Sequence, residues 1–181
     1  MQKEVIVNGL TFVPYLTAQS INNRITELAA DIRADLQGSD PVFLCVLNGA
    51  FIFAADLIRA IGINDAKINF VRYSSYSGTQ TTGNVKQMMG LTEQLEGKDV
   101  VIIEDIVDTG LTATKMVADI RERNPRSVRF ATLLHKPDSS TTGFQPDYVA
   151  FSIPPKFTVG YGLDLDGKGR NLPDIYVIKE D

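Results

Sequence analysis

The sequence predicts an α/β fold, in which a central parallel, doubly wound sheet is flanked by helices. Short apolar segments alternate with segments of helical periodicity between residues 16 and 145, and this alternation is typical of consecutive βαβ units. Residues 100–103 are four consecutive β-branched residues, which indicates a strand buried on both faces. Polar, carboxylate-rich sequence follows that strand directly, as expected at the ligand-binding edge of an open parallel sheet.

The expected elements follow one another with short connections. The first is a helix, because apolar residues recur at helical spacing before Gly38, namely Ile21, Ile25, Leu28, Ile32 and Leu36. Further strands are expected at residues 42–47, 67–72, 100–103 and 128–134, and further helices at residues 50–61 and 112–123.

The two ends of the chain are expected to form a small subdomain beside this core. Residues 146–181 contain proline-rich turns and short strands rather than long helices. We expect them to join residues 1–15 as a cap over a core of about residues 16–145. The 181 residues would then form a single domain.

Composition excludes several classes of protein. Hydrophobic residues make up 44% and charged residues 22% of the chain, as is usual for a globular domain with a substantial core. The net charge of -4 argues against binding to nucleic acid. No window approaches the roughly 18 uninterrupted apolar residues of a membrane span, so no membrane association is expected. The chain has one cysteine and its first residues lack the apolar core of a signal peptide, which favours a cytoplasmic protein.

The strand at residues 100–103 leads into three carboxylates and a glycine-containing turn. Glu104, Asp105 and Asp108 could accept hydrogen bonds from ribose hydroxyls, hold a cation or carry a proton. The turn would offer its backbone amides and hydroxyls to a phosphate through Asp108, Thr109, Gly110, Leu111 and Thr112. A helix cap without ligand is the alternative for this turn, but the acids beside it favour a site for a phosphorylated sugar.

The segment Glu104-Asp105-Ile106-Val107-Asp108-Thr109-Gly110 resembles the phosphoribosyl-diphosphate signature of type I phosphoribosyltransferases. Other segments narrow the resemblance to the hypoxanthine-guanine phosphoribosyltransferases. They occur in the family's order and together extend over about residues 40 to 178, namely 47–50, 74–76 with 82–83, 133–136, 146–151, 156–164 and 170–173. The resemblance implies a type I phosphoribosyltransferase fold, in which the cap is a hood subdomain that holds the base.

The resemblance also implies an activity in purine salvage. The enzymes of this family transfer the 5-phosphoribosyl group from 5-phosphoribosyl 1-diphosphate to hypoxanthine or guanine. The products are IMP or GMP and diphosphate, and the reaction requires Mg²⁺. In this chain Asp108 would be the catalytic base facing N7 of the purine. Glu104 and Asp105 would hold the donor ribose and Mg²⁺, and Asp164 would bind Mg²⁺ through water.

The same resemblance assigns residues to the base. Lys136 would donate a hydrogen bond to O6 of a 6-oxopurine, which an exocyclic amino group could not accept. Phe157 would stack on the base, and Thr158 would offer backbone groups to its edge. Asp164 would lie near the 2-amino group. An ordinary solvated lysine and an ordinary core phenylalanine are the alternatives at the first two positions.

The diphosphate and the lid complete the expected site. Asn48, Gly49 and Arg170 would bind the diphosphate. Many relatives carry a basic residue where this chain has Asn48, so this contact would lack a positive charge. Ser75 and Tyr76 would begin a flexible lid over residues 74–86, which is rich in serine, threonine and glycine. Such a lid would exclude water from the reacting sugar.

Other functions remain open from sequence. A regulatory relative could keep the fold and bind a nucleotide or RNA, and another transferase could use xanthine or a pyrimidine. A dinucleotide-binding protein is disfavoured because no G-x-G-x-x-G follows the first core strand. The family's members are commonly homodimers or homotetramers. We expect Cys45 to be a small buried hydrophobic residue, and His135 to have a structural role or to face solvent rather than to take part in catalysis.

Overall fold

The computed structural model describes residues 3–75, 85–89, 91 and 93–180. The six-stranded core sheet has the order β5-β4-β3-β6-β7-β8. Five of these strands are parallel, and β5 pairs antiparallel with β4 at one edge. The strands are β3 (Val42–Val46), β4 (Lys67–Ser75), β5 (Val85–Met89), β6 (Asp99–Val107), β7 (Ser127–His135) and β8 (Tyr148–Ser152). The predicted doubly wound sheet is therefore confirmed.

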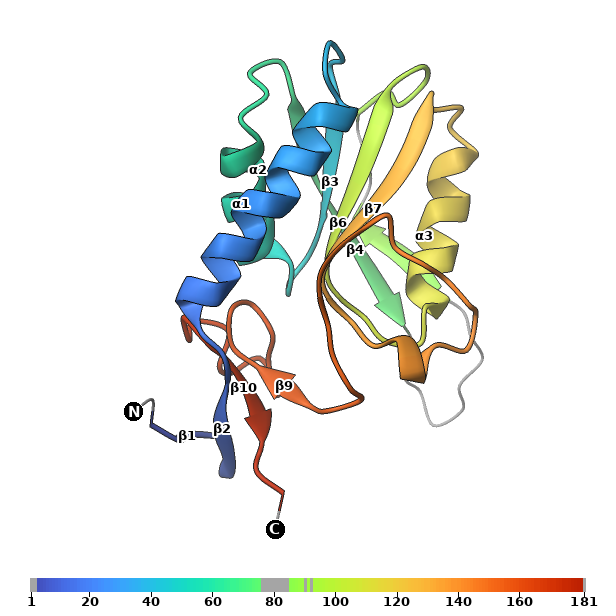
Figure 1. Cartoon of the computed structure of the whole chain (residues 1–181). Coiled ribbons are helices and arrows are strands. Elements are labelled where there is room, and N and C mark those ends of the chain that lie inside the picture. The colour runs from blue at the N-terminus through green and yellow to red at the C-terminus, as the bar shows by residue number, and fades with distance from the viewer. Residues whose placement is uncertain (1–2, 76–84, 90, 92, 181) are drawn as a thin grey trace.

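Helices cover both faces of this sheet (Figure 1). The helices α1 (Ala18–Asp35) and α2 (Phe51–Ile61) lie on one face, and α3 (Leu111–Arg121) lies on the other. A short 3₁₀ helix, η1 (Pro137–Ser139), follows β7. Alternate residues of the strands supply two apolar cores. Phe43 and Ile103 pack with α1 and α2, whereas Leu44 and Ile102 pack with α3. This alternation explains why β3 and residues 100–103 of β6 are apolar at every position.

The hood is a separate antiparallel sheet beyond the carboxyl ends of the core strands (Figure 1). Its order is β1-β2-β10-β9. The strands are β1 (Val5–Val7), β2 (Leu10–Leu16), β9 (Thr158–Val159) and β10 (Ile175–Ile178). The two termini of the chain thus meet in one small layer, with Phe12, Val159 and Tyr176 in its core.

Three boundaries differ from the sequence-based expectations. The strand β8 belongs to the core sheet, so the second segment of the hood begins after Ser152 and not near residue 146. The strand β6 continues through the acids to Val107, since its pairing with β7 extends that far. Residues 85–89, placed in or beside the expected lid, form β5, because they find a partner in the free edge of β4.

Candidate active site

The central strand β6 carries the acids to the edge of the sheet that faces the hood. Its first five residues are buried, and it lies between β3 and β7. Glu104 and Asp105 occupy the last part of this strand, and Asp108 follows it. Their position at the carboxyl end of a central parallel strand is the one that open α/β sheets use for ligands.

The turn after β6 forms an open phosphate-sized pocket. Gly110 has a φ of 82° and caps α3 without a side-chain hydrogen bond of its own. Leu111 is more than half exposed, and its amide lies 3.4 Å from the Thr109 hydroxyl. A cavity of about 100 Å³ lies between the turn and the start of α3. Amides and hydroxyls at a helix amino terminus are suited to an anionic phosphate.

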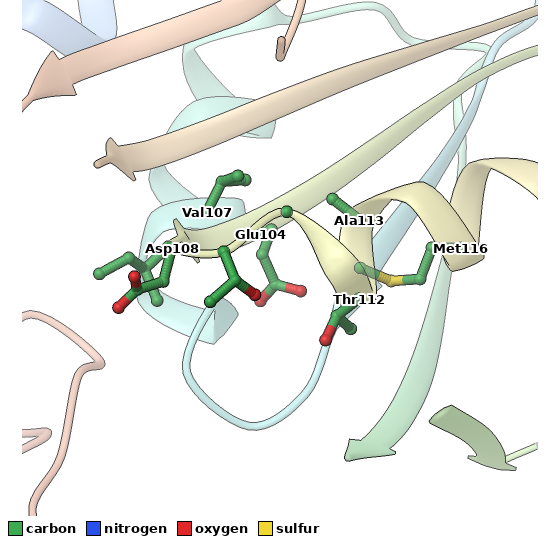
Figure 2. A pocket seen from close by; sticks show the side chains of 9 residues that line it. Glu104, Val107, Asp108, Thr112, Ala113 and Met116 are labelled. Carbon is green, nitrogen blue, oxygen red and sulfur yellow. The ribbon is translucent and has the colours of Figure 1, made fainter. Parts of the chain in front are cut away.

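The side chains around this pocket divide into two directions (Figure 2). Glu104 and Thr112 line the pocket beside the turn after β6, whereas the Asp108 carboxylate points away from them. The Asp108 side chain is 47% exposed. It is therefore available to a second ligand group on the other side of the turn.

A segment that the sequence analysis did not single out holds this turn in place. The backbone amide of Thr141 donates to the carbonyl oxygen of Thr109 over 3.0 Å, and the Thr141 hydroxyl donates to the same oxygen over 3.2 Å. A Cβ on Gly110 would lie 2.4 Å from Oγ1 of Thr142, so only glycine fits there. The run of serines and threonines at residues 139–142 is the feature of the sequence from which this support could have been predicted.

A second cavity, of about 220 Å³, gathers the residues expected at the base. It adjoins the phosphate pocket, since Ile106 and Asp108 line both. Its other lining residues are Asp105, Lys136, Phe157, Thr158, Leu163 and Asp164. All four residues predicted to contact the base therefore surround one space.

Lys136 and Asp108 form an ion pair at the boundary of the two cavities. Nζ of Lys136 donates to Oδ2 of Asp108 over 2.9 Å. The Lys136 side chain is only 10% exposed, and its backbone amide donates to the carbonyl oxygen of Val107. The alternative of a solvated lysine at a strand end is thus wrong. A buried ammonium next to a half-exposed carboxylate presents a strong donor beside a strong acceptor.

The aromatic and the threonine of the base cavity come from the hood. Phe157 is 45% exposed, and its ring centroid lies 6.3 Å from that of Phe12 at an interplanar angle of 47°. It is therefore not a core residue, and its partly exposed ring lines the cavity, where an aromatic side chain is suited to a planar ligand. Thr158 is buried as the first residue of β9.

Glu104 and Asp105 form a pair of neighbouring carboxyl groups. Burial raises the pKa of Glu104 well above its ordinary value, and the nearby Asp105 raises it further. Burial also raises the pKa of Asp105, although hydrogen bonds and Arg170 act in the opposite direction. Two adjacent carboxyl groups in low dielectric repel each other when ionised. A ligand that donates protons or brings positive charge would relieve this repulsion.

The expected diphosphate loop packs directly on Asp105 of this pair. The peptide bond between Leu47 and Asn48 is cis, and Asn48 is exposed. A Cβ on Gly49 would lie 1.5 Å from Oδ2 of Asp105. Glycine is therefore required here because the Asp105 carboxylate occupies the space of a side chain.

Arg170 and Asp164 lie together on the hood side of the site. Their side chains form an ion pair over 2.6 Å, and Asp164 also accepts the amide of Gly167 over 2.6 Å. The sequence-based roles had placed these residues on different ligands, with Arg170 at the diphosphate and Asp164 at Mg²⁺ and the base.

The expected magnesium ligands do not form a cluster of protein ligands by themselves. Among the described residues no group of three or more histidine, cysteine, aspartate and glutamate side chains could hold a metal ion. Mg²⁺ retains several waters and uses one or two carboxylates together with substrate phosphates. The Glu104 and Asp105 pair, with its raised pKa values, fits a divalent cation of this kind.

The remaining expectations concern the lid and two further side chains. Ser75 ends β4, but Tyr76 and residues 77–84 lie outside the described residues. Cys45 is buried, and burial raises its pKa to about 12, so its thiol is not activated. His135 is buried, and burial lowers its pKa. Neither side chain lines either of the two cavities, as expected.

No helix in the described part of the chain is long and apolar enough to cross a membrane.

The family model described as phosphoribosyl transferase domain matches residues 15–166. A hypoxanthine-guanine phosphoribosyltransferase from Streptococcus thermophilus is 39% identical over 164 residues, which are 90% of this chain and 91% of that protein. The corresponding protein from Aquifex aeolicus is 36% identical over 96% of this chain and 98% of its own length.

Solved structures agree with these matches. The crystal structure of a hypoxanthine phosphoribosyltransferase from Staphylococcus aureus superposes with a TM-score of 0.88 at 39% identity, covering 92% of this chain and 91% of that one. The fold, the two adjoining cavities and these relatives agree. The chain therefore belongs to the hypoxanthine-guanine phosphoribosyltransferase family of phosphoribosyltransferases.

Proposed function

We propose that this protein transfers the 5-phosphoribosyl group from 5-phosphoribosyl 1-diphosphate to hypoxanthine or guanine, with release of diphosphate. The observation that carries the proposal is the Lys136 and Asp108 pair, which lies 2.9 Å apart where the phosphate pocket meets the cavity beside Phe157. A site for a ribose phosphate and a site for a planar base are thereby joined through two groups of opposite hydrogen-bonding character.

The pair is suited to one edge of a 6-oxopurine. Such a base presents the acceptor O6 next to the donor N7–H. Lys136 would turn its ammonium from Asp108 to O6, and the Asp108 carboxylate would accept from N7–H. The amino group of adenine cannot accept from an ammonium, so adenine would leave Lys136 buried without a partner, which is costly.

The same arrangement supplies the chemistry. A bond forms between N9 of the purine and C1′ of the ribose, while the bond from C1′ to the diphosphate oxygen breaks and its electron pair leaves with the diphosphate. The proton on N7 moves to Asp108. General-base catalysis of this kind contributes typically ~10²–10⁴-fold in rate. The ionised carboxylate would also stabilise positive charge that develops on the ribosyl ring.

The donor would lie along the carboxyl end of β6. Its 5′-phosphate would accept from the amides of residues 108–112, and its ribose hydroxyls would donate to Glu104 and Asp105. Gly49 and Asn48 would contact the diphosphate, together with Arg170 after it exchanges its bond to Asp164 for one to a phosphate oxygen. The fixed fork of a guanidinium suits such an oxygen pair.

Mg²⁺ fits the residues at this position. Glu104 and Asp105 would hold it directly or through water, and Asp164 would hold it through water. When bound, the cation neutralises charge on the diphosphate and so makes it a better leaving group. The role of Ser75 and Tyr76 as the start of a lid remains a prediction from the sequence.

We also propose that the protein is a cytoplasmic homo-oligomer. Its single cysteine is buried, which suits a reducing compartment. The face of β4 beside α2 exposes Ile68 and Phe70, each by nearly half, and Phe51 adjoins them. This apolar face is typical of a protein contact, and a second copy could bury it through a two-fold interface.

The direct test is an assay of the purified protein with donor, Mg²⁺ and a panel of free bases. Nucleotide formation is followed by ultraviolet absorbance and diphosphate release by a coupled assay. We expect turnover with hypoxanthine or guanine and none with adenine. Turnover with a pyrimidine alone would assign a different transferase, and absence of turnover with every oxopurine would favour a regulatory nucleotide-binding protein.

A further inference from the structure

One residue of the hood contacts both parts of the proposed diphosphate site. Gly162 has a φ of 101°, and a Cβ on it would lie 2.1 Å from the carbonyl oxygen of Gly49. The carbonyl oxygen of Gly162 accepts from Nη1 of Arg170 over 2.6 Å, and its amide donates to the carbonyl oxygen of Arg170 over 2.9 Å. The backbone at Gly162 therefore lies between the diphosphate loop and the arginine.

The preceding residue, Tyr161, has an unusual backbone conformation. It is not glycine, yet its φ is 49°, in the left-handed region that costs an ordinary residue about 1–2 kcal/mol. It is 5% exposed and packs in the core cluster that includes α1 and α2. Such a conformation persists only where the surroundings hold it in place.

The Tyr161 hydroxyl provides one such contact, and it reaches a different part of the molecule. It donates to Oδ2 of Asp56 on α2 over 2.5 Å. Burial raises the pKa of this tyrosine, and Asp56 raises it further, so the hydroxyl keeps its proton. A hydroxyl bonded to a carboxylate is among the stronger hydrogen bonds in proteins. The helix α2 follows the diphosphate loop directly in sequence.

We propose that Tyr161 is a positioning residue for the diphosphate, because its bond to Asp56 fixes the backbone at Gly162 against Gly49 and Arg170. This inference rests on the proposed function. Tyr161 does not itself touch the reacting atoms. Its hydroxyl ties the hood to α2, so that the two diphosphate-binding elements, one from the core and one from the hood, keep a fixed separation.

The test compares Tyr161→Phe with Tyr148→Phe, each as the whole protein. Both variants remove only a hydroxyl from a buried tyrosine that donates to an aspartate, since Tyr148 donates to Oδ2 of Asp35 over 2.6 Å. That second bond joins β8 to α1, outside both cavities. The two variants therefore carry similar costs in stability, and only one of them borders the diphosphate site.

The measurements are the affinities for inorganic diphosphate with Mg²⁺ and for IMP, and the KM for the donor. IMP occupies the base and 5′-phosphate sites without the diphosphate site. We expect Tyr161→Phe to weaken diphosphate binding and raise the donor KM by about 3–10-fold, the range of one lost hydrogen bond. The affinity of Tyr161→Phe for IMP should change by less than about twofold, which is less than the loss of one hydrogen bond. Tyr148→Phe should leave the diphosphate affinity, the IMP affinity and the donor KM unchanged.

A second pair of variants tests the partner. Asp56→Ala should reproduce the loss and add nothing to Tyr161→Phe in the double variant, whereas Asp56→Asn keeps an acceptor and should restore much of the affinity. Equal weakening of IMP and diphosphate, or unchanged diphosphate binding in Tyr161→Phe, would overturn the inference. Failure of the unaltered protein to bind diphosphate or turn over would instead contradict the proposed function.

Discussion

At the residue scale, the ion pair between Lys136 and Asp108 is the feature on which the proposed selectivity of the site depends. The lysine is almost fully buried and the aspartate is half exposed, so the pair can open on one side only. In the absence of ligand each charge compensates the other. A base with an acceptor facing Lys136 and a donor facing Asp108 can replace the hydrogen bond between the two residues with one bond to each of them.

Replacement of Lys136 should relax the selection for an oxopurine. In Lys136→Gln the amide can both donate and accept, so the ratio of kcat/KM for hypoxanthine to that for adenine should fall by about 10–100-fold, as for the loss of a hydrogen bond to a charged group. Lys156→Gln is the matched control, because Lys156 adjoins Phe157 and pairs with Glu180 at the surface. An unchanged ratio in Lys136→Gln would refute the assignment.

The neighbouring carboxyl groups of Glu104 and Asp105 should lower the stability of the fold while they contribute to donor binding. Because burial and Asp105 raise the pKa of Glu104, its ionised form destabilises the fold at neutral pH. Glu104→Gln should therefore raise stability by about 0.5–2 kcal/mol while it weakens donor binding. The gain should be present near pH 8 and disappear below about pH 4, where Glu104 is neutral in both states.

Thermal unfolding at these two pH values measures this effect, and Glu122→Gln at an exposed position of the chain is the control. A loss of stability in Glu104→Gln at pH 8 would show that the carboxylate is well accommodated without a ligand.

The sequence predicted most of the residues that line the two cavities but not their contacts with one another. The strand-end acids and the glycine turn were visible because spacing along one strand fixes their placement. The pairing of Arg170 with Asp164 was not, since it depends on how a hood loop folds on itself. The support from Thr141 was missed for the same reason.

At the element scale, β6 organises the molecule. Its interior positions fill the two cores, its carboxyl end carries the acids, and its amino end is fastened to β7. Helix and strand positions in the core were predictable from periodicity. The strand β5 and the extension of β6 were not, because tertiary pairing, and not local pattern, determines where these strands end.

Asp99 should stabilise the amino end of β6. It accepts from Nε of Arg126 over 3.0 Å and from the Ser127 hydroxyl over 2.7 Å, and Arg126 lowers its pKa to about 2. Asp99→Asn should cost about 1 kcal/mol, after allowance for the exposed arginine, and lower Tm by about 2–4 °C at pH 7.

The pH dependence follows from the direction of the shift. Because the folded pKa of Asp99 lies below the unfolded value of 3.8, its contribution is present above about pH 4 and is lost as the pH falls towards 2. Unfolding of Asp99→Asn and of the surface control Asp31→Asn between pH 2 and 7 measures it. A difference that stays constant over this range would contradict the assignment.

At the scale of the whole molecule, the site lies between two layers that come from distant parts of the chain. The core supplies the phosphate turn and the acids, and the hood supplies Phe157 and Arg170. The helices α1 and α2 leave the β4 side of the sheet uncovered, which exposes Ile68 and Phe70. This face could not be predicted from sequence, because Ile68 and Phe70 alternate with their neighbours as in any half-buried strand.

Charge on the apolar face should disrupt a homo-oligomer. The double variant Ile68→Glu/Phe70→Asp should sediment as a monomer at concentrations where the unaltered protein is a dimer or tetramer, because a two-fold contact would then bury four charges, two from each copy. Ile6→Glu is the control, since Ile6 is 75% exposed on β1 in the hood. A monomeric unaltered protein, or an oligomer that survives the double variant, would contradict the proposed interface.

The central claim is that Asp108 removes a proton from the incoming purine, and Asp108→Asn tests it most directly. The asparagine preserves size but cannot take the proton. Steady-state kinetics with hypoxanthine should show kcat lower by about 10²–10⁴-fold with little change in the KM for the donor. An equal loss in kcat and in donor affinity, or a kcat close to that of the unaltered protein, would contradict the account.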